Sequence, residues 1–314
     1  MNRRLKILIW GIHGSYLNTL LHIPHEWYMP IKPDTEGYGG AGPGLLKRDY
    51  VQNVPAEQVR DLDLDLVIHQ TPRNYFEDHV QILSEEQQKL PRIYLQHNVP
   101  KPHAVDSQHP VDDPNTLLVH VTHFNRLMWD NNRTPTMVIE HSVAIDPSAS
   151  YTGTIERGIT VINSMPRRGR SLGHDLFLEA RRQLPLDIAG MENEELNPIG
   201  DIPYPELHKR VAEYRFLYSP VRYTSLPLSV IEAFHLGMPV VALATTELPM
   251  VIENGVNGYI SCEPQELIER MRELLANPDE ARRIGANARK LAEERFSLER
   301  FTRDWNAAFA QVLS

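Results

Sequence analysis

Apolar residues occur along the chain in short runs that alternate with stretches of helical spacing. In Glu266–Ala276, for example, the apolar side chains recur every three or four residues and form one face of a helix. Strands that alternate with helices predict parallel sheets covered on both faces. The predicted strands form two series: Leu5–Trp10, Leu64–His69, Arg92–Gln96, Leu117–Val121 and Met137–Glu140, and then Ile159–Asn163, Leu186–Ala189, Phe216–Ser219, Pro239–Leu243 and Gly258–Ser261.

A polar stretch without a strand pattern, Asp146–Gly158, separates the two series and is typical of a linker. Near the end of the chain, Ser297 is a candidate N-cap for a helix whose apolar residues recur up to Val312. We therefore predict an α/β protein with two Rossmann-like domains, residues 1–145 and 146–296, that face each other across a cleft. Residues 297–314 form a crossover helix that packs back across both domains. In such sheets, ligands bind beyond the carboxyl ends of the strands.

Composition narrows the class of protein. A length of 314 residues, with 41% hydrophobic and 23% charged residues, is typical of a globular protein with two domains. The net charge of -9 argues against a nucleic-acid-binding protein, which normally shows a basic face. Cys262 is the single cysteine, so an internal disulfide is excluded and a reducing cytosol fits.

The first residues, MNRRLKILIWGIHG, combine basic and apolar positions as a signal peptide does. The apolar core is shorter than the roughly 7–15 residues that a secretory signal needs. We interpret it as a buried first strand and expect a cytoplasmic protein without a membrane span. Peripheral membrane contact stays open, because it requires only a surface patch.

The first candidate site follows the predicted strand Phe216–Ser219. A loop, Pro220–Pro227, leads into a helix that Ser229 is expected to cap and that runs to about Leu236. The free amides and the dipole at the start of a helix attract phosphate. Glu232, one turn in, can accept two hydrogen bonds from a ribose diol, at about 1.5–3 kcal/mol for a charged bond. A solvated glutamate is the alternative, but the neighbours are apolar: Val230, Ile231, Ala233 and Phe234.

The second candidate is Asn163–Gly173, NSMPRRGRSLG, which follows the first strand of the second series. A phosphate-binding loop belongs at this position of a Rossmann-like fold. Arg167, Arg168 and Arg170 supply bidentate donors for a diphosphate, and Gly169 permits a tight turn between them. A solvated basic loop is the alternative interpretation, and the position after a strand favours anion binding.

Weaker signals come from the first half of the chain. Gly14, in the loop after the first strand, lets a ligand approach the backbone, although two glycines are a weak motif. His97 follows the strand RIYLQ and is a minor candidate, because any one of 14 histidines is more often structural than catalytic. The aspartates of DLDLDL resemble a metal-binding Asp-x-Asp pattern, but they lead into a strand and are better explained as its flanking residues. We therefore predict no metal site.

Three consecutive segments carry a family resemblance: LDIAG, GDIPYPELHKRVAEYRFLYSP, and TSLPLSVIEAFHLGMPVVALATTELPMVIENGVNGYI. They resemble the donor-binding half of the family-4 glycosyltransferases, which have the GT-B fold. The likeness extends more weakly through the first half, including VIEHSVAID at the predicted domain crossing. It implies that residues 146–296 bind a nucleotide sugar, that residues 1–145 hold the acceptor, and that no cofactor is needed beyond the nucleotide-sugar co-substrate.

The resemblance implies roles residue by residue. Glu232 matches the second glutamate of the family's Glu-x7-Glu motif, which holds the donor ribose. Arg167 meets the family's arginine at the diphosphate, whereas Leu172 meets its lysine, so we expect Arg168 and Arg170 to supply that charge. The segment whose amides approach the diphosphate corresponds to Leu226, Pro227 and Leu228, and the expected donor-binding set also includes Ser225, Asn163 and Gly14.

Two further positions concern the sugar. His97 is similar to the histidine that approaches the donor sugar from the amino-terminal domain. Thr224 stands where the family has its first glutamate, which contacts the sugar hydroxyls. A threonine hydroxyl offers one neutral contact in place of a charged one, which puts the identity of the sugar in question.

The resemblance implies a retaining transfer of a sugar from a nucleotide-diphosphate sugar to a glycan, lipid-linked or small-molecule acceptor. Arginines and helix amides would stabilise the departing diphosphate, so no metal is required. Two alternatives stay open. A nucleotide-sugar 2-epimerase has the same architecture but needs acid–base residues at the sugar, and no convincing pair is visible. A catalytically inactive, nucleotide-binding relative is suggested by Thr224.

Overall fold

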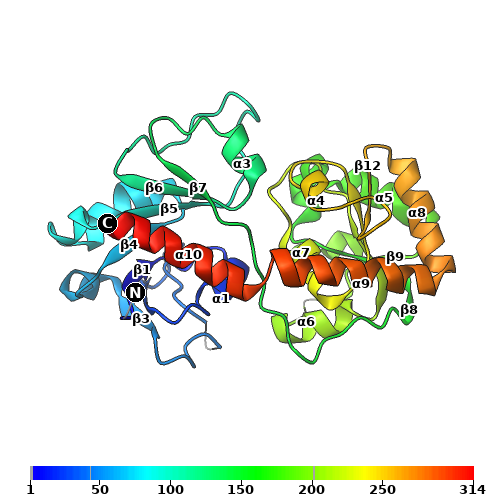
Figure 1. The fold of residues 1–314 in the computed structure, drawn as a ribbon, viewed down its shortest axis with the longest axis horizontal. Coiled ribbons are helices and arrows are strands. Elements are labelled where there is room, and N and C mark those ends of the chain that lie inside the picture. Colours follow the sequence, from blue (N-terminus) through cyan, green and yellow to red (C-terminus); the bar gives the residue numbers. More distant parts are fainter. Residues whose placement is uncertain (1–2, 43, 201) are drawn as a thin grey trace. The chain divides into compact units, whose positions relative to one another are not determined.

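Two separate parallel β-sheets organise the chain in the computed structural model, which describes residues 3–42, 44–200 and 202–314 (Figure 1). Each sheet belongs to its own compact unit. Unit 1 combines Met1–His141 with Leu298–Ser314, and unit 2 is Ser142–Ser297. The last helix is therefore part of unit 1, whereas residues 297–314 were predicted to form a separate crossover segment.

The sheet of unit 1 has the strand order β3-β2-β1-β4-β5-β6-β7, with parallel neighbours throughout. Every residue of β4 and β6 is buried, which explains why these strands read as continuous apolar runs. The strands are β1 (Lys6–Ile9), β2 (Glu26–Ile31), β3 (Val51–Pro55), β4 (Leu66–His69), β5 (Arg92–Gln96), β6 (Thr116–His120) and β7 (Thr136–Val138). The helices are α1 (Gly14–Leu20), α2 (His79–Ile82), α3 (His123–Met128) and α10 (Leu298–Leu313), with shorter turns at Ala56–Asp61, Asn74–Asp78 and Gln87–Lys89.

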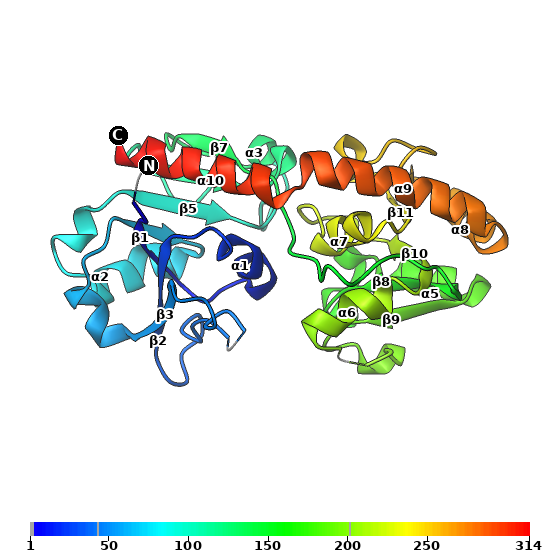
Figure 2. The ribbon, with the colours of Figure 1, turned by 60° about the horizontal axis from the view of Figure 1, so that its bottom comes forward.

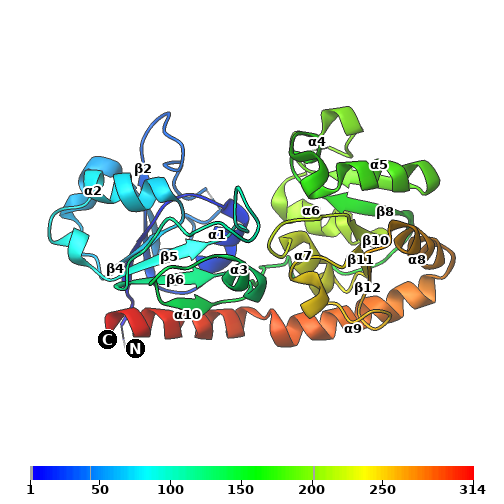
Figure 3. The same ribbon diagram turned by 90° about the horizontal axis from the view of Figure 1, so that it is seen from above.

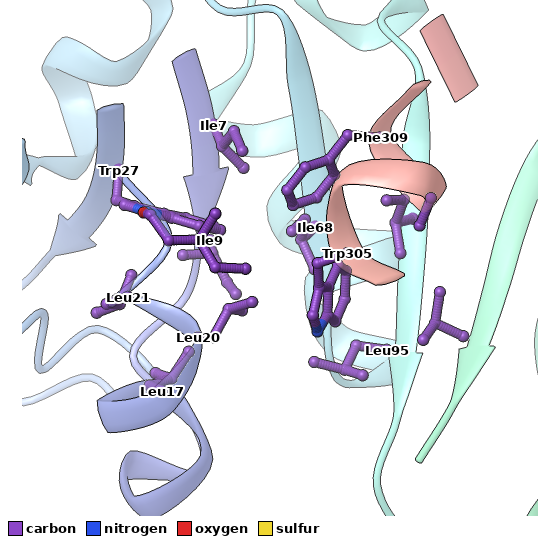
Figure 4. Packing of buried hydrophobic residues seen from close by; sticks show 14 of the residues in the cluster. Ile7, Ile9, Leu17, Leu20, Leu21, Trp27, Ile68, Leu95, Trp305 and Phe309 are labelled. Atoms are coloured by element: carbon purple, nitrogen blue, oxygen red, sulfur yellow. The ribbon is translucent and has the colours of Figure 1, made fainter. Parts of the chain in front are cut away.

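The largest core of unit 1 joins its sheet to the helices α1 and α10. Figure 4 shows Trp305 and Phe309 of α10 beside Ile68 and Leu95 of the sheet. These four side chains are fully buried, and burying one large apolar side chain stabilises a fold by about 1.5–3 kcal/mol. The apolar stripe of the last helix therefore has its partner in the sheet of unit 1.

The sheet of unit 2 has the strand order β12-β11-β10-β8-β9, again with parallel neighbours. Helix α5 covers one face with α8, and helices α7 and α9 cover the other (Figure 3). The strands are β8 (Ile155–Val161), β9 (Leu186–Ala189), β10 (Tyr214–Ser219), β11 (Val240–Leu243) and β12 (Tyr259–Ser261). The helices are α4 (Met165–Arg168), α5 (His174–Gln183), α6 (Tyr204–Val211), α7 (Leu228–Leu236), α8 (Pro264–Ala276) and α9 (Pro278–Arg295), with turns at Gly169–Leu172, Glu194–Leu196 and Leu248–Met250.

The strand orders identify where each unit binds ligands. Unit 1 follows the Rossmann order, and unit 2, counted from its own first strand, has the flavodoxin-like order 2-1-3-4-5. The winding reverses between β1 and β4 in unit 1 and between β8 and β10 in unit 2. Figure 2 shows β10 beside β8 and leading into α7. Ligands of such sheets bind beyond the carboxyl ends of the strands at these switch points.

The structure contains two strands that were not predicted, and it corrects the prediction of the linker. Strands β2 and β3 were not predicted, because their polar and proline positions hide the buried residues Trp27, Met29 and Val54. The expected linker is not free of strand, since β8 begins at Ile155. The charged start of β8 lies toward the surface, where Arg157 forms an ion pair with Asp187 of β9 at 2.6 Å.

Candidate functional site

The two candidate segments of unit 2 lie side by side at its switch point. The backbone amides of Arg222 and Tyr223 donate to the carbonyl oxygen of Ser171 at 3.0 and 3.2 Å, and the Ser171 hydroxyl donates back to the Tyr223 carbonyl. Gly173 has a φ of +75°, and a Cβ there would clash with the carbonyl oxygen of Pro220. The arginine segment, residues 163–173, and the loop Pro220–Pro227 therefore form one site, although some fifty residues separate them in sequence.

The arginine segment is more ordered than a plain loop. It contains the short helix α4 and a 3-10 turn at Gly169–Leu172. Gly169 has a φ of +53°, so the tight turn expected at this glycine is present. The segment thus presents its three arginines from a defined backbone.

The three arginines differ in their partners. Arg167 forms an ion pair with Glu192 at 3.3 Å and donates to the Ser164 hydroxyl at 3.1 Å. Arg170 forms an ion pair with Asp175 at 2.6 Å. The guanidinium of Arg168 has no hydrogen-bonding or acidic partner among the residues that the structure describes. Burial by surrounding atoms and the charge of Arg167 lower the pKa of Arg168. An anion bound beside Arg168 would stabilise its charged form and so oppose both effects.

Sequence reasoning missed a fourth arginine at this site. Arg222 binds Asp175 through both terminal nitrogens, at 2.5 and 2.9 Å, and donates to the carbonyl oxygen of Arg170 at 2.9 Å. The Arg222 contact is the main cause that lowers the pKa of Asp175. One carboxylate thus balances two arginines, and the site keeps a positive charge. A single arginine in a loop gave no sequence signal, because its partner lies far away along the chain.

Helix α7 begins two residues earlier than predicted and without the expected cap. Pro227, not Ser229, occupies the N-cap position, and no side chain caps the helix. The amides of the first turn are therefore not occupied by a capping side chain and suit an anion. Glu232 is 8% exposed, and its neighbours Val230 and Phe234 are fully buried. The solvated alternative for Glu232 is thereby excluded.

A buried histidine from the preceding helix lies beside Glu232. His208 of α6 is 2% exposed, and its Nε2 atom is 3.8 Å from Oε1 of Glu232. Its Nδ1 atom accepts a hydrogen bond from the backbone amide of Asp146 at 3.4 Å. Sequence reasoning missed His208, since one histidine in an amphipathic helix resembles an ordinary packing residue.

The remaining predicted residues of unit 2 are half-buried or buried. Thr224 is half-buried and makes no hydrogen bond within the described part of the chain. Ser225 and Leu226 are buried, and the carbonyl oxygen of Ser225 accepts from the Thr246 hydroxyl at 3.4 Å. Asn163 accepts a hydrogen bond from the backbone amide of Met191 at 2.9 Å, so it joins the loops after β8 and β9. Pro227 and Leu228 are half-buried at the start of α7.

In unit 1, His97 lies at the carboxyl end of β5, and its protonation is set by a chain of hydrogen bonds. The side-chain amide of Gln70 donates to the carbonyl oxygen of Trp10 at 2.9 Å. The oxygen of the same amide is then left to accept from Nε2 of His97, at 2.9 Å. His97 therefore carries its proton on Nε2, and Nδ1 is the acceptor atom.

Aromatic rings surround His97. The ring of His13 lies 4.1 Å away and the ring of Tyr16 lies 4.8 Å away, centroid to centroid. Burial lowers the pKa of His97 well below its usual value, and His13 and His141 add to the effect. The imidazole is thus neutral near pH 7. Gly14 begins α1, and a Cβ there would meet no atom within 4 Å, so local packing does not require glycine.

The aspartates of DLDLDL form ion pairs with basic residues of the first strand region. Asp63 lies 2.9 Å from the amine of Lys6, and Asp65 lies 2.6 Å from the guanidinium of Arg3. Within the described ranges, no group of three or more His, Cys, Asp or Glu residues is arranged to hold a metal ion. None of the helices that the structure describes is long and apolar enough to span a membrane.

One family model matches a segment in the second half of the chain. Residues 164–291 match the model of the family described as glycosyl transferases group 1. Arg168, Arg170, Thr224 and Glu232 all lie inside the matched segment. Among curated proteins, spore coat protein SA of Bacillus subtilis (strain 168) is 35% identical over 72 residues. That match covers 22% of this chain and 19% of the relative, so it spans only a small part of that protein's length.

Comparison with solved structures identifies the fold of the whole chain. Anabaena HepE, solved in complex with UDP-glucose, has a TM-score of 0.73 at 14% identity, covering 98% of this chain and 100% of that one. Sucrose-phosphate synthase from Thermosynechococcus elongatus has a TM-score of 0.71 at 13% identity, covering 98% and 99%. S. aureus TarM, in a complex that contains UDP, has a TM-score of 0.60 at 18% identity, covering 78% and 55%. The predicted fold class, with two Rossmann-like domains of the GT-B type, is confirmed.

Proposed function

We propose that this protein transfers a sugar from a UDP-sugar to an acceptor, with retention of configuration at the anomeric carbon, as family-4 glycosyltransferases do. The position of Glu232 carries the proposal. Its carboxylate is buried one turn into α7, whose N-terminus has no capping side chain, within the segment that matches group 1 glycosyl transferases. A carboxylate at this depth can bind the two hydroxyls of a ribose while the first amides of the helix bind phosphate.

The charge of the arginine segment supports a role at the diphosphate. Arg168 lacks an acidic partner within the described residues, and Arg170 shares Asp175 with Arg222. When the bond to the sugar breaks, negative charge grows on the departing diphosphate. Arginines that are already held in position stabilise this charge most in the transition state. This support makes a metal ion unnecessary in the proposed mechanism.

The nucleotide is proposed from the relatives, since HepE was solved with UDP-glucose and TarM in a complex containing UDP. Donor binding would involve Arg167, Ser225 and Leu226 in unit 2. In unit 1, His97 and Gly14 are proposed to serve the sugar and the acceptor, a glycan, a lipid-linked molecule or a small molecule.

A donor panel tests the proposal directly. Purified protein is incubated with UDP-glucose, UDP-N-acetylglucosamine or UDP-galactose and a mixture of acceptors, and release of UDP is measured. Acceptor-dependent release of UDP from one donor supports a transferase. Formation of an epimer without acceptor identifies the 2-epimerase alternative instead. Binding of UDP without consumption of any donor identifies an inactive relative.

Two further measurements test the finer parts of the proposal. The anomeric proton coupling of the product, measured by NMR, distinguishes retention from inversion. Activity in the presence of EDTA is expected to equal activity without it, because the arginines supply the positive charge. Loss of activity in EDTA that Mg²⁺ or Mn²⁺ restores would contradict the metal-independent mechanism.

A further inference from the structure

The environment of His208 sets which of its nitrogen atoms carries a proton. The backbone amide of Asp146 is a donor only, and it points at Nδ1 of His208 at 3.4 Å. Nδ1 must therefore be unprotonated and act as the acceptor. In the neutral imidazole the proton then lies on Nε2, the atom that is 3.8 Å from Oε1 of Glu232. At 3.8 Å the two groups are too far apart for a hydrogen bond, and they interact through the attraction between the imidazole N–H and the carboxylate charge.

The same histidine holds the segment that enters unit 2. Asp146 forms an ion pair with Lys209, the next residue of α6, at 3.2 Å. The carboxylate of Asp146 also accepts hydrogen bonds from the hydroxyl and the backbone amide of Ser148. These bonds, together with the contact to Lys209, lower the pKa of Asp146 to about 2. The turn Asp146–Ala149 is therefore fastened to α6 at two successive residues, one of which faces Glu232.

Burial makes the contact between His208 and Glu232 consequential. The side chains are 2% and 11% exposed, so water screens the interaction weakly. A buried carboxylate is stabilised by donors that are already oriented, and its rotamer decides where the two oxygens point. A carboxylate that binds a diol needs both oxygens in one plane with the hydroxyls. A small rotation of Glu232 would lose one of the two hydrogen bonds.

We propose that His208 is a positioning residue for Glu232, which holds the carboxylate in the rotamer that binds both ribose hydroxyls and links it to the segment at Asp146. His208 does not touch the ligand. It determines how strongly the site prefers a ribonucleotide to a deoxyribonucleotide. This inference rests on the proposed function, because it assumes that Glu232 binds the ribose of UDP.

Two variants test the contributions of the two ring nitrogen atoms of His208 separately. In His208→Gln the side-chain amide nitrogen takes the position of Nε2 and can donate to Glu232, but nothing replaces Nδ1. In His208→Asn the amide reaches only as far as Nδ1, so the Asp146 amide keeps an acceptor and the N–H group beside Glu232 is lost. Both variants are polar and smaller than or similar to histidine, and both should fold.

The measurement is the ratio of the dissociation constants of dUDP and UDP, obtained by calorimetry for the full chain. We expect His208→Gln to keep the ratio of the parent, and His208→Asn to reduce it by about three- to tenfold, in line with one weakened charged hydrogen bond. The melting temperature should show the opposite order, with His208→Gln lower because the Asp146 amide loses its partner. A purely structural role would change stability without changing the ratio.

The outcomes distinguish this inference from the proposed function. If the parent binds UDP tenfold or more tightly than dUDP and both variants keep that ratio, His208 does not position Glu232. If both variants reduce the ratio of the dissociation constants of dUDP and UDP equally, His208 acts through packing, and the proposed role of its Nε2–H group is wrong. If the parent does not bind UDP, or binds dUDP equally well, the ribose assignment of Glu232 fails and the inference fails with it.

Discussion

The carboxyl edges of the two sheets carry different polar chemistry. In unit 1 the groups after β4 and β5 are neutral, with the imidazole of His97 bound to the amide of Gln70. In unit 2 they are charged, with Arg168, Arg170 and Arg222 around the carboxylate of Asp175. The same type of sheet thus presents a neutral hydrogen-bonding edge in one unit and a cationic edge in the other.

The physical cost of burial explains why the two edges differ. A charged group at a buried site needs a counter-charge or an incoming ligand, whereas a neutral imidazole needs only a hydrogen bond. A diphosphate is matched by the cationic edge, and a hydroxyl-bearing sugar or acceptor is matched by the neutral edge. This division fits the proposed function, in which unit 2 holds the nucleotide and unit 1 holds the acceptor.

The largest expected effect concerns the neutral histidines of unit 1 at acid pH. Burial lowers the pKa of His109 and His120 to about 4 and of His141 to about 3. The unfolded chain binds these protons near pH 6.5, so it holds more protons than the folded chain between pH 6.5 and 4. Stability is therefore present above pH 6.5 and falls as the pH decreases through this window, by about 2 kcal/mol per histidine at pH 5.

Tryptophan fluorescence measures this effect in unit 1 specifically. All four tryptophans, Trp10, Trp27, Trp129 and Trp305, belong to unit 1. The urea midpoint by fluorescence should fall from pH 7 to pH 5. His109→Gln should flatten this dependence on pH, and His123→Gln, at an exposed position, should leave it unchanged. A midpoint that stays constant down to pH 5 would show that the histidines are not neutral in the folded protein.

The repeating elements of the fold are predictable from the sequence, whereas its irregular elements are not. β5 and β9 have the bounds expected from their apolar runs, since strands buried on both faces leave a continuous pattern. β2 and β3 escaped prediction because only part of each strand is buried and each strand contains a proline. The start of β8 escaped because Arg157 is balanced by Asp187, a partner from another strand.

For the candidate site, the sequence indicates residues but not their partners. The position of Glu232 in an apolar helix predicts its burial, and the structure bears this out. That Arg167 and Arg170 form ion pairs while Arg168 does not could not be predicted, because the pairing depends on where Glu192 and Asp175 lie in the folded chain. Pairings of this kind join residues that share no spacing pattern, so they appear only in the folded chain.

The next largest effect is expected at the cationic edge of unit 2. The double variant Arg168→Gln, Arg170→Gln should lower turnover by roughly a hundredfold, because positive charge is lost where the diphosphate departs. Affinity for uridine, which carries no phosphate, should stay unchanged. Arg168→Gln alone should account for most of the loss, since Asp175 already offsets the charge of Arg170.

Steady-state kinetics and uridine binding together check this prediction. Arg282→Gln is the matched control, because Arg282 is exposed on α9 and pairs with Asp279. Its turnover should equal that of the parent. Equal losses of turnover and of uridine affinity in the double variant would indicate a collapsed segment and would argue against a role for charge.

A smaller effect is expected from the carboxylate that holds the ribose. Glu232→Ala should weaken UDP binding by about tenfold to a hundredfold, the value of one or two charged hydrogen bonds. Calorimetry with UDP measures the change, and circular dichroism verifies the fold. Glu269→Ala, at an exposed position of α8, is the control and should bind UDP as the parent does. Unchanged affinity in Glu232→Ala would reject the ribose assignment.

The smallest effect is expected at Thr224, the position that separates this chain from the resembled family pattern. Thr224 is half-buried, and its hydroxyl has no partner within the described residues, so it is available to a sugar. A neutral hydrogen bond contributes about 0.5–1.5 kcal/mol. Thr224→Val should therefore reduce turnover by at most about tenfold and leave UDP affinity nearly unchanged.

Thr224→Glu sharpens the same comparison, because it adds a charged acceptor where the family has one. This variant should shift the preference among donor sugars, measured as relative kcat/KM over the donor panel, while UDP affinity stays the same. If Thr224→Val weakens UDP binding as much as Glu232→Ala does, Thr224 belongs to the nucleotide site and not to the sugar site. If both Thr224 variants match the parent for every donor, the residue does not reach the sugar. The chain would then select its sugar through other groups, and the neutral edge of unit 1 is the part of the molecule to examine, beginning with His97.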